Sequence, residues 1–340
     1  MRHGQILISI GNQATSGGVC LWRWLGAMTN MRAVGQDALG GPEVLKIVEV
    51  ERPEPGPVEV LVRVHAAGVN PTDWKSRANG GRFGASRPIL GFDVSGVVAA
   101  VGLGVTLYEP GDEVFGMPRF PHPAGAYAEY VTAPPRHFIR KPASLDHVHA
   151  AALPLAALTA WQGLVDTAGL EAGQRVLVHA AGGGVGHLAV QIAKARGAHV
   201  IGTARSAKHD FVRSLGADEV IDYTKTDFAE AVRDVDVVLD TIGGDYGPRS
   251  LRTLRDGGVL VSIVPPVDEA LRSAAAERGI AAGWTLVEPD YAGLKEIVAL
   301  VESGRLRAEI DTVFPLEEAA KAHALGETGR TTGKIVLTVA

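Results

Sequence analysis

The sequence predicts an α/β protein with a β-rich, barrel-like domain and a second domain built on a doubly wound parallel sheet. Up to about residue 150, short β-rich runs alternate with Gly and Pro. From residue 174, buried apolar runs alternate with helical patterns, as in βαβ units. The length of 340 residues agrees with two domains, because single hydrophobic cores rarely grow beyond about 250–300 residues.

Composition narrows the classes of function. The 33 Lys and Arg residues against 38 Asp and Glu residues give a formal charge of −5, which argues against a globally basic nucleic-acid-binding protein. The single cysteine, Cys20, excludes an intramolecular disulfide and a zinc site built from cysteines. No stretch of about 18 residues is apolar throughout, because each is interrupted by a charged residue or a helix breaker. We therefore expect no transmembrane helix and no membrane partner.

Residues 1–30 differ from the rest of the chain and are predicted to be an N-terminal extension, to which we assign no function. The apolar run at residues 6–10 is short, whereas a secretory leader carries a longer apolar region and a small-residue cleavage site. A strand pattern begins at Met31, so removal of the preceding residues is expected to leave folding and cofactor binding unchanged. We expect a cytoplasmic protein.

The first block is predicted to be all β. Residues 44–50 and 58–64 form β-rich runs on either side of a proline-rich turn, which predicts a hairpin-like pair. Further short strands are predicted at residues 96–101, 113–115 and 128–131.

The second block alternates strands and helices. Strands are predicted at residues 174–179, 199–203, 219–222, 236–240 and 258–264, with helices at 186–196, 208–215 and 228–232. The tail carries helices at 291–302 and 317–324 and a strand at 334–339, and it can return to the first domain. The expected domains are therefore residues 31–152 with 285–340, and residues 153–284.

A glycine-rich loop between the strand at 174–179 and the helix at 186–196 is the strongest chemical signal. Read as A-x-G-x-x-G, it places Ala181 at a tight turn, Gly183 where a pyrophosphate approaches the backbone, and Gly186 where helix and sheet pack closely; Gly184 and Val185 complete the loop. The start of the helix offers free N–H groups to phosphates. The alternative is a tight turn without a ligand.

The next strand indicates which dinucleotide binds. NAD sites carry an acidic residue about 20 residues beyond the glycines. Here no acid occurs before Asp210, and Arg205, Ser206 and Lys208 occupy the region instead. Two cations and a hydroxyl suit a 2′-phosphate, which favours NADPH. The alternative is a solvated cationic turn.

Several ordered segments resemble the zinc-independent, zeta-crystallin-like quinone oxidoreductases of the medium-chain dehydrogenase/reductase superfamily. The resemblance extends from Met31 to the C-terminus and is carried by residues 67–73 (AGVNPTD), 90–98 (LGFDVSGVV), 111–116 (GDEVFG), 125–130 (GAYAEY), 181–186 (AGGGVG), 239–244 (LDTIGG) and 333–336 (GKIV). It implies a GroES-like barrel made from both chain ends around an inserted Rossmann domain. It also implies a homodimer and a small-molecule electron acceptor.

The resemblance implies further cofactor contacts. Lys208 and Tyr223 match positions at the adenosine phosphate end, while Thr241, Ser262 and Val264 follow later strands and are expected to line the ribose and nicotinamide. Arg330 and Lys334 match a C-terminal segment that folds over the cofactor. The alternatives are plain packing for Tyr223 and a solvated charge for Arg330.

A catalytic zinc is not expected. Zinc-dependent relatives place a Cys where this chain has Asn70 and a His where it has Phe92, and a phenylalanine cannot bind a metal. His147 and His149 are interpreted as a solvated turn rather than as metal ligands.

Without a Lewis acid, an electron-poor acceptor such as a quinone or an α,β-unsaturated carbonyl compound suits hydride transfer best. The resemblance places Asn70 near the nicotinamide; the alternative role is forming a turn before Pro71. Lys75 is either a donor to a developing oxyanion or a solvated helix residue, and Trp74 either packs in the core or forms the pocket floor. Two other functions stay open: an enoyl-reductase-like enzyme of secondary metabolism and a non-catalytic NADPH-binding protein.

Overall fold

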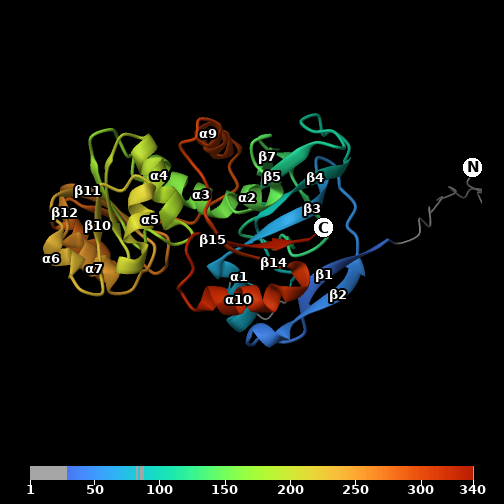
Figure 1. The fold of residues 1–340 in the computed structure, drawn as a ribbon, viewed down its shortest axis with the longest axis horizontal. Helices are drawn as coiled ribbons and strands as arrows, with labels where there is room; N and C mark the ends of the chain where they lie inside the picture. The colour runs from blue at the N-terminus through green and yellow to red at the C-terminus, as the bar shows by residue number, and fades with distance from the viewer. Residues whose placement is uncertain (1–28, 82, 85–87, 340) are drawn as a thin grey trace, which may run out of the picture.

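The computed structural model describes residues 29–81, 83–84 and 88–339. Two lobes lie side by side, one built on a parallel sheet and the other on a mostly antiparallel, barrel-like sheet (Figure 1). The predicted fold class is confirmed, because the chain enters the barrel lobe first, crosses to the parallel sheet, and returns to the barrel at its C-terminal end.

The parallel sheet has six strands in the order β10-β9-β8-β11-β12-β13, which is the doubly wound arrangement. In chain order they are β8 (Arg175–Val178), β9 (His199–Thr203), β10 (Glu219–Ile221), β11 (Val235–Asp240), β12 (Leu254–Ser262) and β13 (Ala281–Trp284). Every neighbouring pair in this sheet is parallel. The strand order reverses between β8 and β11, and ligands of such sheets bind at the carboxyl ends of the strands near that point.

Helices cover both faces of the parallel sheet, because its strands bury side chains on both faces. Val176 and Val178 of β8 belong to the core beneath one set of helices, whereas Leu177 between them packs with Phe228 on the opposite face. The helices of this lobe are α3 (Pro154–Trp161), α4 (Gly186–Ala195), α5 (His209–Ser214), α6 (Phe228–Ala231), α7 (Tyr246–Leu251) and α8 (Glu269–Ala276).

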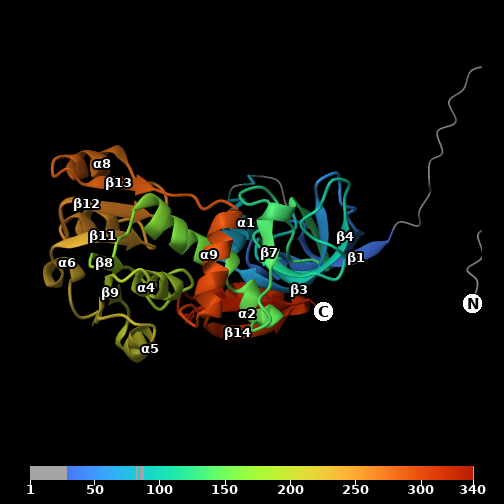
Figure 2. The same ribbon diagram turned by 90° about the horizontal axis from the view of Figure 1, so that it is seen from above.

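The barrel lobe contains a seven-stranded sheet and a separate antiparallel pair. The sheet comprises β14 (Ile310–Pro315), β15 (Lys334–Thr338), β3 (Val60–Val69), β4 (Val94–Val101), β5 (Glu113–Gly116), β7 (Phe138–Arg140) and β6 (Tyr130–Ala133), and the pair is β1 (Asn30–Gln36) with β2 (Leu45–Glu51). Its helices are α1 (Pro71–Asn79), α2 (His147–Ala151) and α10 (Ala319–Glu327). Helix α9 (Tyr291–Glu302) packs against α3 and β7 and lies between the lobes in Figure 2.

The predicted hairpin between residues 44–50 and 58–64 is wrong. The first run is β2, which pairs with β1, and the second lies in β3, which pairs with β4, β6 and β15. The proline-rich segment therefore connects two separate sheets. Strand β3 is buried over nearly its whole length, and such a strand needs partners on both sides.

The interpretation of His147 as part of a solvated turn is also wrong. His147 begins α2, its ring stacks on His65 with centroids 4.4 Å apart, and its Nδ1 lies 2.8 Å from Ser95 Oγ. His149 also belongs to α2, but its side chain is exposed, and its backbone N–H and its ring contact Asp146, the residue before the helix. Within the described ranges, no cluster of three or more potential ligands has metal-binding geometry.

No helix in the part of the chain that the structure describes has the length and apolar character needed to span a membrane.

Candidate active site

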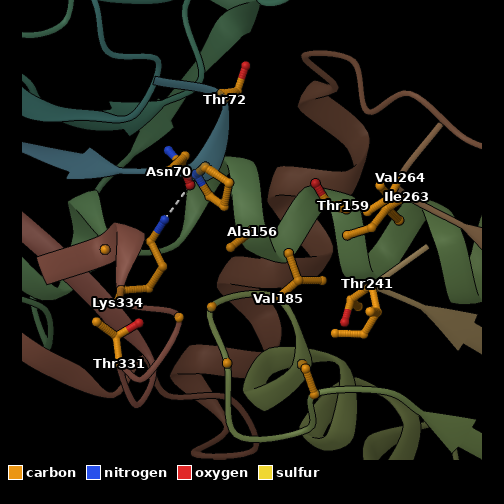
Figure 3. A pocket seen from close by; sticks show the side chains of 18 of the residues that line it. Asn70, Thr72, Ala156, Thr159, Val185, Thr241, Ile263, Val264, Thr331 and Lys334 are labelled. Carbon is orange, nitrogen blue, oxygen red and sulfur yellow. Dashed lines mark hydrogen bonds between the residues drawn. The ribbon is translucent and has the colours of Figure 1, made fainter. Parts of the chain in front are cut away.

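A cavity of about 870 Å³ lies between the lobes, at the carboxyl ends of the parallel strands. Ala180, Thr203, Thr241 and Ile263, which follow or end β8, β9, β11 and β12, line its Rossmann side. In Figure 3 the side chains of Asn70 and Lys334 lie across from Thr241 and Val264, with Ala156 and Val185 between them. The cavity thus occupies the place where doubly wound sheets bind their ligands.

The glycine loop is held in shape by backbone contacts. Ala180 takes a left-handed conformation with φ of 47°, and its carbonyl accepts the N–H of Gly183 at 2.8 Å. A Cβ on Gly186 would lie 2.2 Å from that same carbonyl oxygen, so only glycine fits where α4 begins. Ala181 is fully buried, and its N–H donates to the carbonyl of Thr203.

Of the other loop glycines, Gly183 and Gly184 have the most room, whereas a Cβ on Gly182 would lie 2.9 Å from Lys208 Cδ. A Cβ on Gly183 would meet nothing closer than the Ala180 carbonyl at 3.2 Å, and one on Gly184 would meet Lys334 Cδ at 3.5 Å. Both residues line the cavity next to the N-terminus of α4. This bare backbone, with the N–H groups of Gly184, Val185 and Gly186 that have no acceptor in the described ranges, fits a dinucleotide pyrophosphate.

His187, which no sequence pattern singled out, supports the loop from behind. Burial lowers the pKa of His187 to about 4, so the ring is neutral at physiological pH. Its Nδ1–H donates to the Gly183 carbonyl at 2.9 Å, and its Nε2 accepts the N–H of Glu309 at 3.2 Å. The neutral ring therefore joins the loop to the segment that leads back into the barrel lobe.

The predicted adenosine-end residues take different roles. Arg205 and Tyr223 both line the cavity, and Arg205 Nε donates to Tyr223 Oη at 3.0 Å. Ser206 does not line it, because its hydroxyl and its backbone N–H both donate to Asp222. Hydrogen bonds from Ser206 and Thr224 hold the pKa of Asp222 well below its usual value, so this acid is already occupied.

Lys208 joins the glycine loop to residues 329–334, which we call the C-terminal strap. Its Nζ donates to the carbonyls of Gly182 and Thr331. The strap makes a second link, since the N–H of Gly333 donates to the Gly182 carbonyl at 3.2 Å. Arg330 of the strap lines the cavity.

The residues after the later strands divide into two groups. Thr241 and Val264 line the cavity, and Thr241 Oγ1 donates to the His179 carbonyl at 2.8 Å. Ser262 does not line the cavity: it is buried and bonds to Asp240 and to the Val264 carbonyl. It supports the turn that carries Val264.

Asn70 lies at the barrel side of the cavity, immediately before α1. The residue is 2% exposed, and its backbone N–H donates to Asp73 Oδ2 at 2.8 Å. Its side-chain Nδ2 donates to Asp93 Oδ2 at 2.8 Å, while its Oδ1 accepts from Lys334 Nζ. Asn70 is therefore both a turn residue and a cavity residue, with every heavy polar atom engaged.

A buried polar chain extends from Asp73 to the surface. An arginine only donates, so His323 Nδ1 accepts from Arg77 and its Nε2–H donates to Tyr127 Oη, which leaves the phenol hydrogen for Asp73 Oδ2 at 3.0 Å. Burial lowers the pKa of His323 to about 3, which agrees with this neutral tautomer. The other oxygen of Asp73, Oδ1, is buried with no hydrogen-bond partner.

The stability of the barrel lobe should depend on pH through Asp73. Burial raises the pKa of Asp73 to about 7. The folded state then binds more protons than the unfolded state between about pH 4 and pH 7. The stability that protonated Asp73 contributes is therefore fully present below about pH 4 and is lost as the pH rises through 7. As the pH rises from 5 to 8, the unfolding free energy of Asp73→Asn should increase by about 2–3 kcal/mol relative to that of wild type.

Chemical denaturation of both proteins at several pH values measures this gain. Asp210→Asn, at an exposed position on α5, is the matched control and should show no such gain. Parallel pH curves for wild type and Asp73→Asn would contradict a raised pKa at this site.

The walls around Asn70 are mostly apolar. Trp74 is half-buried and lines the cavity, and its ring also packs on Gly326, where a Cβ would lie 2.6 Å from the indole. Both roles considered for Trp74 therefore hold. Lys75 is exposed, lines the cavity, and has no hydrogen-bond or ion-pair partner in the described ranges. Phe92 is buried against Phe120, with ring centroids 4.9 Å apart.

Other cavity residues were not predicted. Among them are Ala156 and Thr159 of α3, and Trp284 and Leu286 at and beyond the end of β13. The apolar helix at residues 154–161 is visible in the sequence, but only its packing between the lobes shows that three of its residues, Leu155, Ala156 and Thr159, reach the cavity.

Comparison with known proteins gives consistent matches. Residues 56–143 match the family described as alcohol dehydrogenase GroES-like domain, and residues 215–337 match that described as zinc-binding dehydrogenase. The mitochondrial NAD(P)H oxidoreductase RTN4IP1 of Mus musculus is 35% identical over 83% of this chain and 82% of its own. The chloroplastic NADPH-dependent alkenal/one oxidoreductase of Arabidopsis thaliana is 35% identical over 97% of this chain and 85% of its own. The structure of the quinone oxidoreductase from Coxiella burnetii superimposes with a TM-score of 0.87 at 39% identity, covering 92% of this chain and all of that one.

Proposed function

The chain belongs to the quinone oxidoreductase family of the medium-chain dehydrogenases/reductases, and we propose that it uses NADPH to reduce a quinone or an α,β-unsaturated carbonyl compound without a catalytic metal. One observation carries the proposal: the glycine loop and the buried Asn70 open into a single cavity with apolar walls. A cofactor on the loop and an acceptor against the walls would therefore meet beside Asn70.

The lining residues indicate which part of the cavity would hold which part of the cofactor. Gly183 to Gly186 at the start of α4 would hold the pyrophosphate, with the buried Ala181 supporting the turn behind them, and Arg205 with Tyr223 would hold a 2′-phosphate. Thr241, Val264 and Arg330 would contact the ribose and nicotinamide portions. Ser206, Lys208 and Ser262 are assigned supporting roles, because their polar groups already bond to the protein.

The acceptor would be flat and apolar. NADPH held on the glycine loop would supply a hydride to an electron-poor carbon of the acceptor, and one proton from water or a side chain would complete the reduction. Lys75 is our candidate donor to the acceptor oxygen, because its ammonium lines the cavity and has no protein partner within the described ranges. Trp74 and Phe120 would exclude water around the reacting atoms.

Steady-state oxidation of NADPH with a panel of quinones, enones and enoyl thioesters tests the proposal. Turnover with quinones or enones supports it, and preference for the thioesters would favour an enoyl-reductase-like enzyme. Tight NADPH binding without turnover on any acceptor would favour a non-catalytic binding protein.

The cofactor preference gives a sharp prediction. Wild type should bind NADPH more tightly than NADH, and Arg205→Asp should erase or reverse this preference because removing a charge-assisted hydrogen bond costs about 1.5–3 kcal/mol. Fluorescence titration with both cofactors measures it. Arg196→Asp, an exposed residue at the end of α4 that does not line the cavity, controls for net charge. Equal affinities of the wild type for both cofactors would argue against NADPH specificity.

Metal independence is a separate prediction. At the positions where zinc-dependent relatives carry ligands, this chain has an amide engaged by Asp93 and Lys334 and a phenyl ring packed on Phe120. Elemental analysis should find no stoichiometric zinc, and a chelator should leave turnover unchanged. One tightly bound zinc per chain would overturn this part of the proposal.

We also propose a homodimer formed through β13. This strand ends the parallel sheet and pairs only with β12 among the described strands, so one row of its backbone groups is free to pair with a second copy. Light scattering at micromolar concentration should give twice the mass of the chain.

A cytoplasmic location is proposed as well. Two of the relatives compared above are mitochondrial or chloroplastic by name, so cell fractionation decides the compartment.

A further inference from the structure

Lys334 does not have the surroundings of a phosphate ligand. It begins β15 and is 3% exposed, and its Nζ lies 3.1 Å from the Val69 carbonyl, next to Asn70 Oδ1, and 3.4 Å from Asp93 Oδ2. An ammonium group has three hydrogens, and these three acceptors use them. Only its methylene stem, which approaches Gly184, is left to face a bound cofactor.

The same contacts fix the orientation of the Asn70 amide. A lysine ammonium only donates and a carboxylate only accepts, so Asn70 Oδ1 must face Lys334 and Nδ2 must face Asp93 (Figure 3). Asp93 is itself fixed, because its other oxygen accepts the N–H of Leu155 at 2.7 Å. The second hydrogen of Asn70 Nδ2 has no acceptor in the described ranges.

We propose that Lys334 is a positioning residue that locks the Asn70 amide with its nitrogen as the free hydrogen-bonding group, so that the site offers a donor to the oxygen of the acceptor or of the nicotinamide carboxamide. This inference rests on the proposed function. Without Lys334, rotation of the amide by half a turn exchanges oxygen and nitrogen at little cost in shape. The site would then offer a lone pair where the reaction needs a hydrogen.

Lys334→Met tests the lock, because methionine keeps the stem and removes all three hydrogens. The rate of hydride transfer in a single turnover should fall roughly 10- to 100-fold, the range that loss of a supporting partner costs at other sites. Lys334→Arg should recover part of the rate because it restores a donor. Affinity for 2′,5′-ADP, which reports the adenosine end alone, should stay within about twofold of wild type, since the loop and Arg205 are untouched.

A second variant separates positioning from folding, because Lys334→Met leaves the Asp93 carboxylate buried and unpaired. In Asp93→Asn/Lys334→Met both charges are gone. The amide introduced at position 93 would accept from Leu155 through its oxygen and present its nitrogen to Asn70, which favours the reversed Asn70 amide. This double variant should regain melting temperature and still transfer hydride slowly. A wild-type rate in either folded variant would overturn the proposal.

A third measurement needs no turnover. In cofactor-free protein labelled with ¹⁵N, the two side-chain amide signals of Asn70 are identified by their disappearance in Asn70→Asp. They should shift in Lys334→Met but not in Lys141→Met, which removes another buried ammonium group of the same lobe, one that bonds to the Leu145 carbonyl and to Glu113. Unchanged Asn70 signals in Lys334→Met would overturn the proposal that Lys334 fixes the Asn70 amide, even if no acceptor is found. If the wild type shows no turnover but the Asn70 signals still shift in Lys334→Met, the result would count against the proposed function alone.

Discussion

Gly186→Ala is expected to abolish tight NADPH binding and to lower the melting temperature even without cofactor. The added Cβ would lie 2.2 Å from the Ala180 carbonyl oxygen and 2.8 Å from Ala181 Cα, so it meets the backbone just beyond the end of β8. Neither contact can be relieved by rotating a side chain. The end of β8 and the start of α4 must separate, and overpacking of this kind costs about 3 kcal/mol.

The weaker binding follows from the same displacement. If α4 moves away, the N–H groups of Val185 and Gly186 at its start and the Gly183 backbone no longer converge on one point. Removing one charge-assisted hydrogen bond to a phosphate costs about 1.5–3 kcal/mol, so removing two weakens binding at least about 100-fold. Thermal melting of the cofactor-free protein and fluorescence titration with NADPH measure the two effects separately.

The neighbouring glycines provide matched controls for Gly186→Ala. Gly184→Ala would place its Cβ no closer than 3.5 Å to any other group and should keep the melting temperature. Gly183→Ala should also fold, since its nearest contact is 3.2 Å, but it should bind NADPH more weakly because the methyl group stands where the pyrophosphate approaches. A Gly186→Ala protein with normal melting and normal binding would show that the loop does not form the cofactor site.

The Rossmann half of the candidate site could be predicted because it is local in sequence. Strand, loop and helix follow one another within residues 174–196, so hydrophobic period and glycine spacing are enough to place Gly183 and Gly186. Helix α9 was predicted with the bounds Tyr291–Glu302 for the same reason, since its apolar face repeats along one continuous segment.

The barrel half could not be predicted at the same level, because its contacts join distant segments. Strand β3 pairs with β15 from the far end of the chain, and no local pattern distinguishes that partner from the nearby run at 44–50. The contact of Lys334 with Asn70 arises from this same pairing. The sequence placed both residues in the site but not against each other.

Side-chain direction was the other limit. Ser262 ends β12 and Val264 follows two residues later, yet only Val264 reaches the cavity. The chain leaves the strand between them, so the alternation of a β-strand no longer decides which side chain faces the cavity. Ser206 shows the same limit, because the nearby Asp222 takes both of its donors.

Asn70→Ala should lower turnover by about 2–4 kcal/mol in activation free energy, or roughly 30- to 1,000-fold, if the amide donates to charge that develops in the transition state. The fold should survive. Alanine keeps the backbone N–H that donates to Asp73 Oδ2, and Lys334 keeps the Val69 carbonyl and Asp93 as partners. We expect a loss of about 1 kcal/mol in unfolding free energy, which corresponds to roughly 2–4 °C in melting temperature.

A role limited to the turn before α1 predicts the opposite result, with lower thermal stability and near-normal turnover per folded molecule. Melting temperature and single-turnover oxidation of NADPH, measured on one preparation, therefore distinguish the two roles. Asn79→Ala is the matched control: it truncates the same residue type at the other end of α1, outside the cavity, and should leave turnover unchanged. A well-folded Asn70→Ala protein that transfers hydride at the wild-type rate would remove Asn70 from the catalytic residues. Catalysis would then rest on the cofactor and the apolar walls around it.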